Sequence, residues 1–74
     1  MVQRIRNKKF LDRLAKNLKL ARKKRGVTQE ELAFKAGLTL SQIARIETAQ
    51  INTSISTIFA ILQALDVEAN ELFK

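Results

Sequence analysis

Residues 28–47, TQEELAFKAGLTLSQIARIE, contain two helix starts in close succession. Thr28 is followed three residues later by Glu31, which is the T-x-x-E capping box that closes the first turn of a helix. Thr39 and Gln42 repeat this spacing with Gln in the third position. The segment therefore predicts one short helix after Thr28 and a second after Thr39.

The turn between these helices has its own signals. Gly37 stands where the first helix must end with a residue that tolerates a positive φ. Val27 and Leu32, and likewise Leu38 and Ile43, have the spacing of a hydrophobic staple around each cap. These features favour a helix-turn-helix unit of the kind that places its second helix in the DNA major groove, over a generic helical hairpin.

Composition limits the remaining possibilities. A chain of 74 residues holds one domain, and the absence of Cys and His removes disulfides and the usual zinc ligands. There is no Pro, Gly occurs twice, and no segment alternates long enough for a strand, so we expect an all-α fold. We expect no metal and no cofactor. Without a long apolar run or signal segment, we expect a cytoplasmic, nucleoid-associated protein with no membrane contact.

The net charge of +7 lies mainly in the N-terminal third. Residues 1–26 carry eleven Lys or Arg against one acid, and residues 27–74 carry three against six. We predict a flexible basic arm over residues 1–9 and a DNA-binding domain over residues 10–74. The arm is either a solvated terminus or a DNA contact, and its cations are Arg4, Arg6, Lys8 and Lys9.

Three further helices are predicted around the central pair. Apolar residues at three- and four-residue steps predict one helix from Phe10 to Arg25, which ends at Gly26. Ser54 is a plausible N-cap for a fourth helix, and residues 68–73 can form a short fifth. The fourth helix is expected to be central to the core, because its apolar residues cover more than half its circumference: Ile55, Ile58, Phe59, Ile61, Leu62 and Leu65.

The helix after Thr39 has an inward side with Ile43 and Ile46 and an outward side with a single charge. Arg45 on the outward side can donate two hydrogen bonds to guanine, which discriminates between bases by roughly 1–3 kcal/mol. On the same side, Leu40 or Ala44 can contact a thymine methyl and Ser41 a base edge, and Thr48 completes the outward side. This side is the predicted DNA-reading surface.

The segment from Leu14 to Phe73 resembles the Xre family of prokaryotic regulators, which includes the lambda-type repressors and Cro. The resemblance lies in NLKLARKKRGVTQEELA, AGLTLSQIARIE, SISTIFAILQALDV and ELF. It implies a compact five-helix, lambda-repressor-like DNA-binding domain in which helices two and three form the helix-turn-helix. It also implies a transcriptional regulator, a repressor or autoregulator, that binds a two-fold symmetric operator in double-stranded DNA as a homodimer.

The resemblance assigns roles to individual residues. The recognition helix, about residues 40–48, would face bases with Leu40, Ser41, Ala44 and Arg45. Phosphates would be held by Gln29 and Thr39, and we also expect phosphate contacts from Lys35, Thr48 and Gln50. Arg22 and Glu47 match the family's paired Arg and Glu, a structural ion pair. For the dimer interface we predict Val67, Leu72 and Phe73, which could instead close the monomer core.

The sequence departs from the family pattern after the recognition helix. Ala49 and Thr53 stand where relatives usually carry Gly and often Pro, and a positive φ at Ala49 would store strain on the order of 1 kcal/mol. Leu40 is apolar where relatives often carry Gln or Arg. Fewer hydrogen bonds are therefore available to specify bases.

Other functions were weighed against DNA binding. An antitoxin or accessory protein of the same fold would act mainly through a protein partner. A membrane-surface role for the basic first helix is less well supported, because its apolar stripe is explained by the core. We expect no enzyme activity, because no nucleophile has a base beside it in the sequence pattern.

Overall fold

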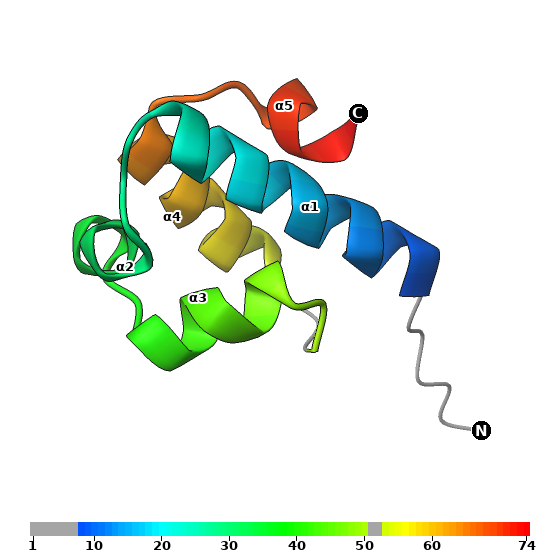
Figure 1. Ribbon diagram of the computed structural model, residues 1–74, viewed down its shortest axis with the longest axis horizontal. Coiled ribbons are helices and arrows are strands. Elements are labelled where there is room, and N and C mark those ends of the chain that lie inside the picture. The colour runs from blue at the N-terminus through cyan, green and yellow to red at the C-terminus, as the bar shows by residue number, and fades with distance from the viewer. Residues whose placement is uncertain (1–7, 51–52) are drawn as a thin grey trace.

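The computed structural model describes residues 8–50 and 53–74, and over these ranges the chain forms five α-helices. In chain order they are α1 (Lys8–Lys24), α2 (Gln29–Ala36), α3 (Leu40–Glu47), α4 (Ile55–Leu65) and α5 (Ala69–Phe73). α1 packs against α3 and α5, and α2 packs against α3 and α4 (Figure 1). The predicted all-α fold, with α2 and α3 as the central pair, is confirmed.

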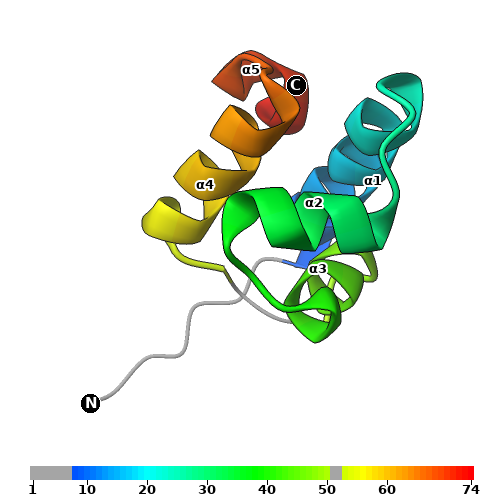
Figure 2. The ribbon, with the colours of Figure 1, turned by 90° about the vertical axis from the view of Figure 1, so that its left-hand side faces the viewer.

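The helices enclose the core from different sides. Figure 2 shows α3 at the lower edge of the molecule, α1 on one side, α4 on the other and α5 at the top. α2 crosses between the sides of α1 and α4, just above α3. The lower surface of the molecule is therefore formed by α3. No helix in the described ranges is long and apolar enough to cross a membrane.

Both predicted capping boxes form. The Glu31 amide donates to Thr28 Oγ1 at 3.0 Å, and the Thr28 amide donates back to Glu31 Oε1 at 2.9 Å. Thr39 and Gln42 make the same two bonds at 3.0 and 2.9 Å. Gly37 has φ 71° and ends α2 as predicted. Local hydrogen bonds thus fix where both helices of the pair begin.

The first cap also determines an ionisation. Hydrogen bonds from Thr28, with a smaller contribution from Lys35, hold the pKa of Glu31 below its ordinary value. A carboxylate with a lowered folded-state pKa stabilises the fold at neutral pH, and this contribution disappears as acid protonates it. The start of α2 is therefore fully capped at neutral pH and weakens in acid.

The core joins all five helices. The five largest fully buried side chains come one from each helix: Leu18, Leu32, Ile43, Ile61 and Leu72. Smaller residues such as Ala21 and Ala33 are also buried and let the helices approach closely. Because every helix contributes to one cluster, we expect the described domain to unfold cooperatively.

The start of α1 corrects the predicted arm. α1 begins at Lys8, two residues before the predicted boundary, so Lys8 and Lys9 belong to its first turn. Lys8 Nζ lies 3.5 Å from Asp12 Oδ1, an i,i+4 pair that favours this extra turn. Arg4 and Arg6 lie outside the described residues.

The fourth and fifth helices bury different residues than predicted. Ile58, Ile61 and Leu65 face the core, but Ile55 is 83% exposed and Phe59 58% exposed. α4 therefore has an apolar flank in contact with solvent, because only one side of the helix is covered by its neighbours.

The predicted dimer interface also needs correction. Leu72 is fully buried in the core of the monomer, so its assignment to that interface was wrong. Phe73 is 40% exposed, and its ring stacks on that of Phe10 at a centroid distance of 5.8 Å. Val67 is partly buried and packs against the core.

The turn after α3 adopts a glycine conformation without glycine. Ala49 has φ 59°, and the Gln50 amide donates to the Arg45 carbonyl at 2.9 Å to close the helix end. Ala49 therefore adopts the positive φ whose cost the sequence analysis considered. Asp66 ends α4 at φ 56°, but Asp enters this region more easily than Ala.

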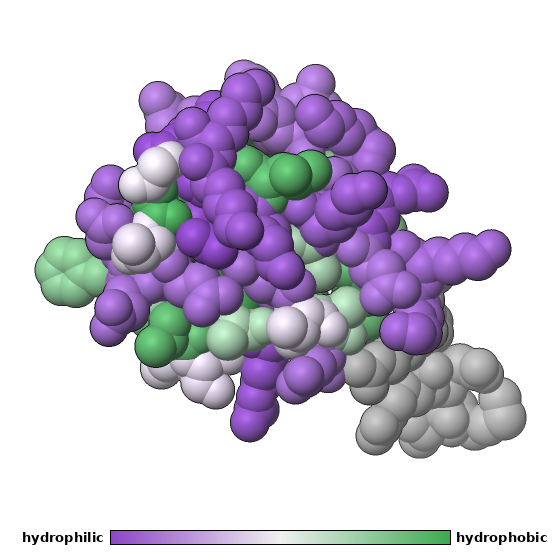
Figure 3. Space-filling model, in the orientation of Figure 1, coloured by the Kyte–Doolittle hydropathy of each residue, from purple (hydrophilic) through white to green (hydrophobic). Residues whose placement is uncertain are grey.

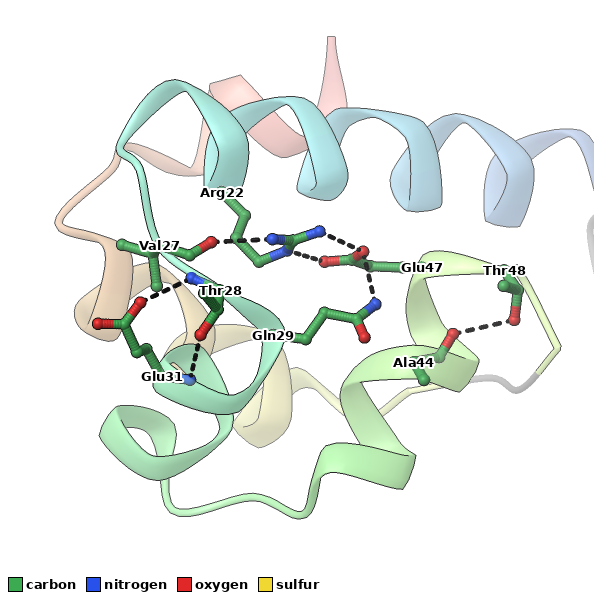
Figure 4. A network of polar contacts seen from close by, with 8 residues as sticks. All are labelled: Arg22, Val27, Thr28, Gln29, Glu31, Ala44, Glu47 and Thr48. Atoms are coloured by element: carbon green, nitrogen blue, oxygen red, sulfur yellow. Dashed lines mark hydrogen bonds and ion pairs between the residues drawn. The ribbon is translucent and has the colours of Figure 1, made fainter.

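A buried polar network connects α1, α2 and α3 (Figure 4). Arg22 donates from Nε to Glu47 Oε2 at 2.6 Å and from a second nitrogen to Oε1 at 3.1 Å, so the predicted pair forms. A third Arg22 nitrogen donates to the Val27 carbonyl at 2.8 Å. Gln29 Nε2 donates to Glu47 Oε1 at 3.0 Å. Glu47 is only 4% exposed, and its carboxylate is thus satisfied entirely by protein donors.

We predict that Glu47→Gln lowers the free energy of unfolding by about 3–5 kcal/mol, because the buried Arg22 guanidinium loses its counter-charge. Arg25→Gln is the matched control: its 3.5 Å pair with Glu71 is partly exposed, so the expected loss is below about 1 kcal/mol. Urea unfolding measures both. Equal losses would contradict the special role of the buried pair.

We predict that Ala49→Gly stabilises the domain by about 0.5–1 kcal/mol. Relief of the left-handed conformation outweighs the added entropy of the unfolded chain. Ala60→Gly, the same substitution within α4, should destabilise it by about 1 kcal/mol. The sign of the shift in melting temperature tests this, and destabilisation by both variants would refute strain at Ala49.

Candidate nucleic-acid interface

α3 lies at the lower edge of the molecule (Figure 2), and its two sides differ in burial. Ile43, Ile46 and Glu47 are buried on the inward side. The four predicted base-facing residues lie on the other side, where Ala44 is half-buried and the rest are exposed: Leu40, Ser41, Ala44 and Arg45. The burial pattern therefore brings these four side chains onto one accessible strip.

Arg45 carries the only charge on this strip. Its side chain is exposed and, within the described part of the chain, has no ion pair or side-chain hydrogen bond. Its guanidinium thus keeps all its donors available for an acceptor outside the protein. Leu40 is 45% exposed and adds an apolar contact surface beside it.

The two helix starts present different donors. Thr39 Oγ1 accepts from the Gln42 amide, which leaves its hydroxyl proton available. The first amides of α2 have no partner within the helix, as at any helix N-terminus. The Gln29 side chain, predicted to hold a phosphate, already donates to Glu47. A phosphate contact at Gln29 therefore has the backbone amide and the remaining Nε2 hydrogen available.

Two of the other residues predicted to contact phosphate already use donors in hydrogen bonds within the protein. Thr48 donates its hydroxyl proton to the Ala44 carbonyl at 3.0 Å, so in this conformation its oxygen cannot donate to a phosphate. The Gln50 amide is used to close the helix end. Lys35 lies in the last turn of α2 with its ammonium exposed. Phosphate contacts by these residues remain predictions.

Two features of the surface were missed from the sequence. Gln29 is a third member of the Arg22–Glu47 network, and its position directly after the N-cap Thr28 gave no signal of that bond. The sequence predicts the exposed flank of α4 to be core, because hydrophobicity alone does not show which side a neighbouring helix covers. Among the described residues, no group of three acidic or other metal-ligating side chains comes together.

Comparison with known proteins extends this picture. A family model described as helix-turn-helix matches residues 18–72. Antitoxin HipB of Escherichia coli O6:H1 is 44% identical over 54 residues, which cover 73% of this chain and 57% of the relative. The immunity repressor protein of Bacillus phage phi105 is 37% identical over 59 residues, which cover 80% of this chain and 41% of the relative. The chain thus spans only about half the length of these curated relatives.

A solved structure matches over most of both chains. The restriction-modification controller protein C.AhdI from Aeromonas hydrophila superposes with a TM-score of 0.82 at 38% sequence identity. The match covers 85% of this chain and 96% of the controller protein. With the family model and the sequence relatives, this likeness establishes that the chain belongs to the helix-turn-helix family of Cro/C1-type (Xre) DNA-binding regulators.

Proposed function

We propose that this protein is a transcriptional regulator, a repressor or autoregulator, that binds a two-fold symmetric operator as a homodimer with α3 in the major groove. The observation that carries this proposal is the outward strip of α3, where an unpartnered Arg45 stands among uncharged side chains. The names of two relatives, an immunity repressor and a controller protein, support a regulatory role.

The contrast between the buried and outward sides of α3 supports base reading. Its buried side is held by the core and by the bond from Arg22 to Glu47, so the outward side has a defined direction. A guanidinium held at the surface without an acidic partner is suited to the O6 and N7 acceptors of guanine. Leu40 and Ala44 are suited to thymine methyl groups.

Dimerisation has a better candidate surface than the one predicted. Ile55 and Phe59 stand four residues apart on one flank of α4 and are both mostly exposed. Figure 2 shows α4 on one side of the molecule and α3 at its base, so a second copy related by a two-fold axis beside α4 would present its own α3 in the same direction. Val67 and Phe73 remain predicted interface residues.

The name of the Escherichia coli relative supports a second proposal, in which the same fold also holds a protein partner. Phe34 on the outer side of α2 is 88% exposed, far more than a side chain of this size usually is in a free monomer. Duplex binding without sequence preference, together with a second protein that co-purifies from the native host, would favour this function over operator recognition.

We predict that Arg45→Ala loses roughly 5- to 150-fold in preference for a selected operator over random DNA, the equivalent of about 1–3 kcal/mol. The operator would first be selected from a random duplex library. Arg13→Ala, which removes the same charge from an exposed position on α1, is the control and should leave the preference unchanged. If Arg45→Ala keeps the full preference for the selected operator over random DNA, Arg45 does not contact bases.

We predict that Phe59→Ala raises the dissociation constant of the homodimer about 10-fold or more, because an interface Phe contributes about 1.5–3 kcal/mol when buried. Phe34→Ala removes a still more exposed Phe from α2 and should leave dimerisation intact. Sedimentation equilibrium measures both variants. If the wild type stays monomeric at high micromolar concentration, or both variants behave alike, α4 is not the interface.

A further inference from the structure

The cations of α1 lie on two flanks that adjoin different helices. Arg22 points to α3, where it bonds Glu47. Residues three and four apart share one side of a helix, so Lys19 lies on the flank of Arg22 and Lys23 follows four residues after Lys19. Lys16, three residues before Lys19, continues this row. We call these three lysines, Lys16, Lys19 and Lys23, the α3-side strip.

The other flank faces α5. Asn17, buried on this side, donates to the carbonyls of Leu72 at 3.0 Å and Lys74 at 3.1 Å. Lys24 and Asn17 line a small cavity between α1 and α5 together with Glu71. Arg13, four residues before Asn17, lies on the same flank. We call Arg13 and Lys24 the α5-side pair.

The two flanks differ in how their charge is balanced. On the α5 side, Glu71 lies against Arg25 at 3.5 Å and lines the cavity with Lys24. The α3-side strip has no ion pair within the described part of the chain. The nearest acid in its row is Asp12, whose carboxylate pairs with Lys8 at 3.5 Å. Like charges at these spacings disfavour a helix, so folding alone does not explain the strip.

The α3-side strip lies on the side of the molecule where α2 begins. Figure 2 shows α2 beginning on the side of α1, and α1 standing above α3 on that same side. With α3 in a major groove, the phosphate backbone that passes the first turn of α2 runs along this side of the molecule. Figure 3 shows that the face over α1 is largely hydrophilic.

We propose that Lys16, Lys19 and Lys23 form a second phosphate-binding strip, distinct from the helix-turn-helix itself, that follows one DNA strand beside the groove. This inference rests on the proposed function, because it assumes that α3 enters the groove. The strip supplies sequence-independent affinity, whereas the α5-side pair stays away from DNA.

Two double variants test the strip at equal net charge. Lys19→Gln with Lys23→Gln removes two strip cations, and Arg13→Gln with Lys24→Gln removes two from the other flank; each lowers the net charge from +7 to +5. Lys23 and Lys24 are a close match, because both are exposed lysines in the last turn of α1. Binding to the selected operator and to one random-sequence duplex is measured from low to high salt.

The strip variant should reduce the slope of log K against log salt by about 2, since each phosphate contact contributes about 0.9. If the strip variant and the wild type bind equally at 1 M salt, the variant should bind about 60-fold more weakly at 0.1 M salt, on both duplexes alike. The α5-side variant should keep the wild-type slope. Circular dichroism should report unchanged helicity and melting for both.

Each other outcome overturns the inference in a recognisable way. Equal slope changes in the two variants would mean that only net charge matters, and unchanged slopes in both would mean that the strip does not meet phosphate. If the wild type binds neither duplex, the proposed function itself fails. If the two double variants have the same salt slope but operator preference is preserved, the strip is excluded as a phosphate-binding site. Base reading by Arg45 is then unaffected.

Discussion

The bonds to the Glu47 carboxylate determine the direction in which α3 faces. One buried carboxylate accepts from Arg22 of α1 and from Gln29 of α2, so three helices converge on the end of the recognition helix. A buried ion pair adds little net stability compared with a well-packed apolar substitute, but the two-pronged Arg contact is directional. Its contribution to function is therefore the angle of α3, which apolar packing alone would define less sharply.

This constraint divides α3 into a side for folding and a side that the proposed function turns to DNA. Because Ile43, Ile46 and Glu47 are buried, the accessible side of an eight-residue helix keeps few positions, and only Arg45 among them carries a charge. In the proposed complex with DNA, base recognition then rests on few contacts, and most of the binding free energy comes from elsewhere. The cations of α1 and a second copy of the chain are the sources that the molecule offers.

What the sequence could predict was mostly local. The caps at Thr28 and Thr39, the turn at Gly37 and the strained Ala49 depend on residues within one turn, so their patterns were sufficient. Burial on the last two helices was not predictable in this way. Leu72 and Phe59 are both apolar at helical spacing, yet one is fully buried and the other mostly exposed, because neighbouring helices cover different sides. The DNA-facing roles follow from the family resemblance and from exposure, and all of them remain predictions.

α1, α3 and α4 each bury one side in the core and leave a different side exposed for the proposed functions. α3 turns its inward side to the core and leaves Arg45 outside, α4 does the same with Phe59, and α1 turns Arg22 inward while Lys19 stays in solvent. None of these exposed side chains contributes to the core, so each can change with little effect on folding. The proposed base preference, self-association and electrostatic affinity can therefore vary independently in this fold, as long as Glu47 keeps its two donors.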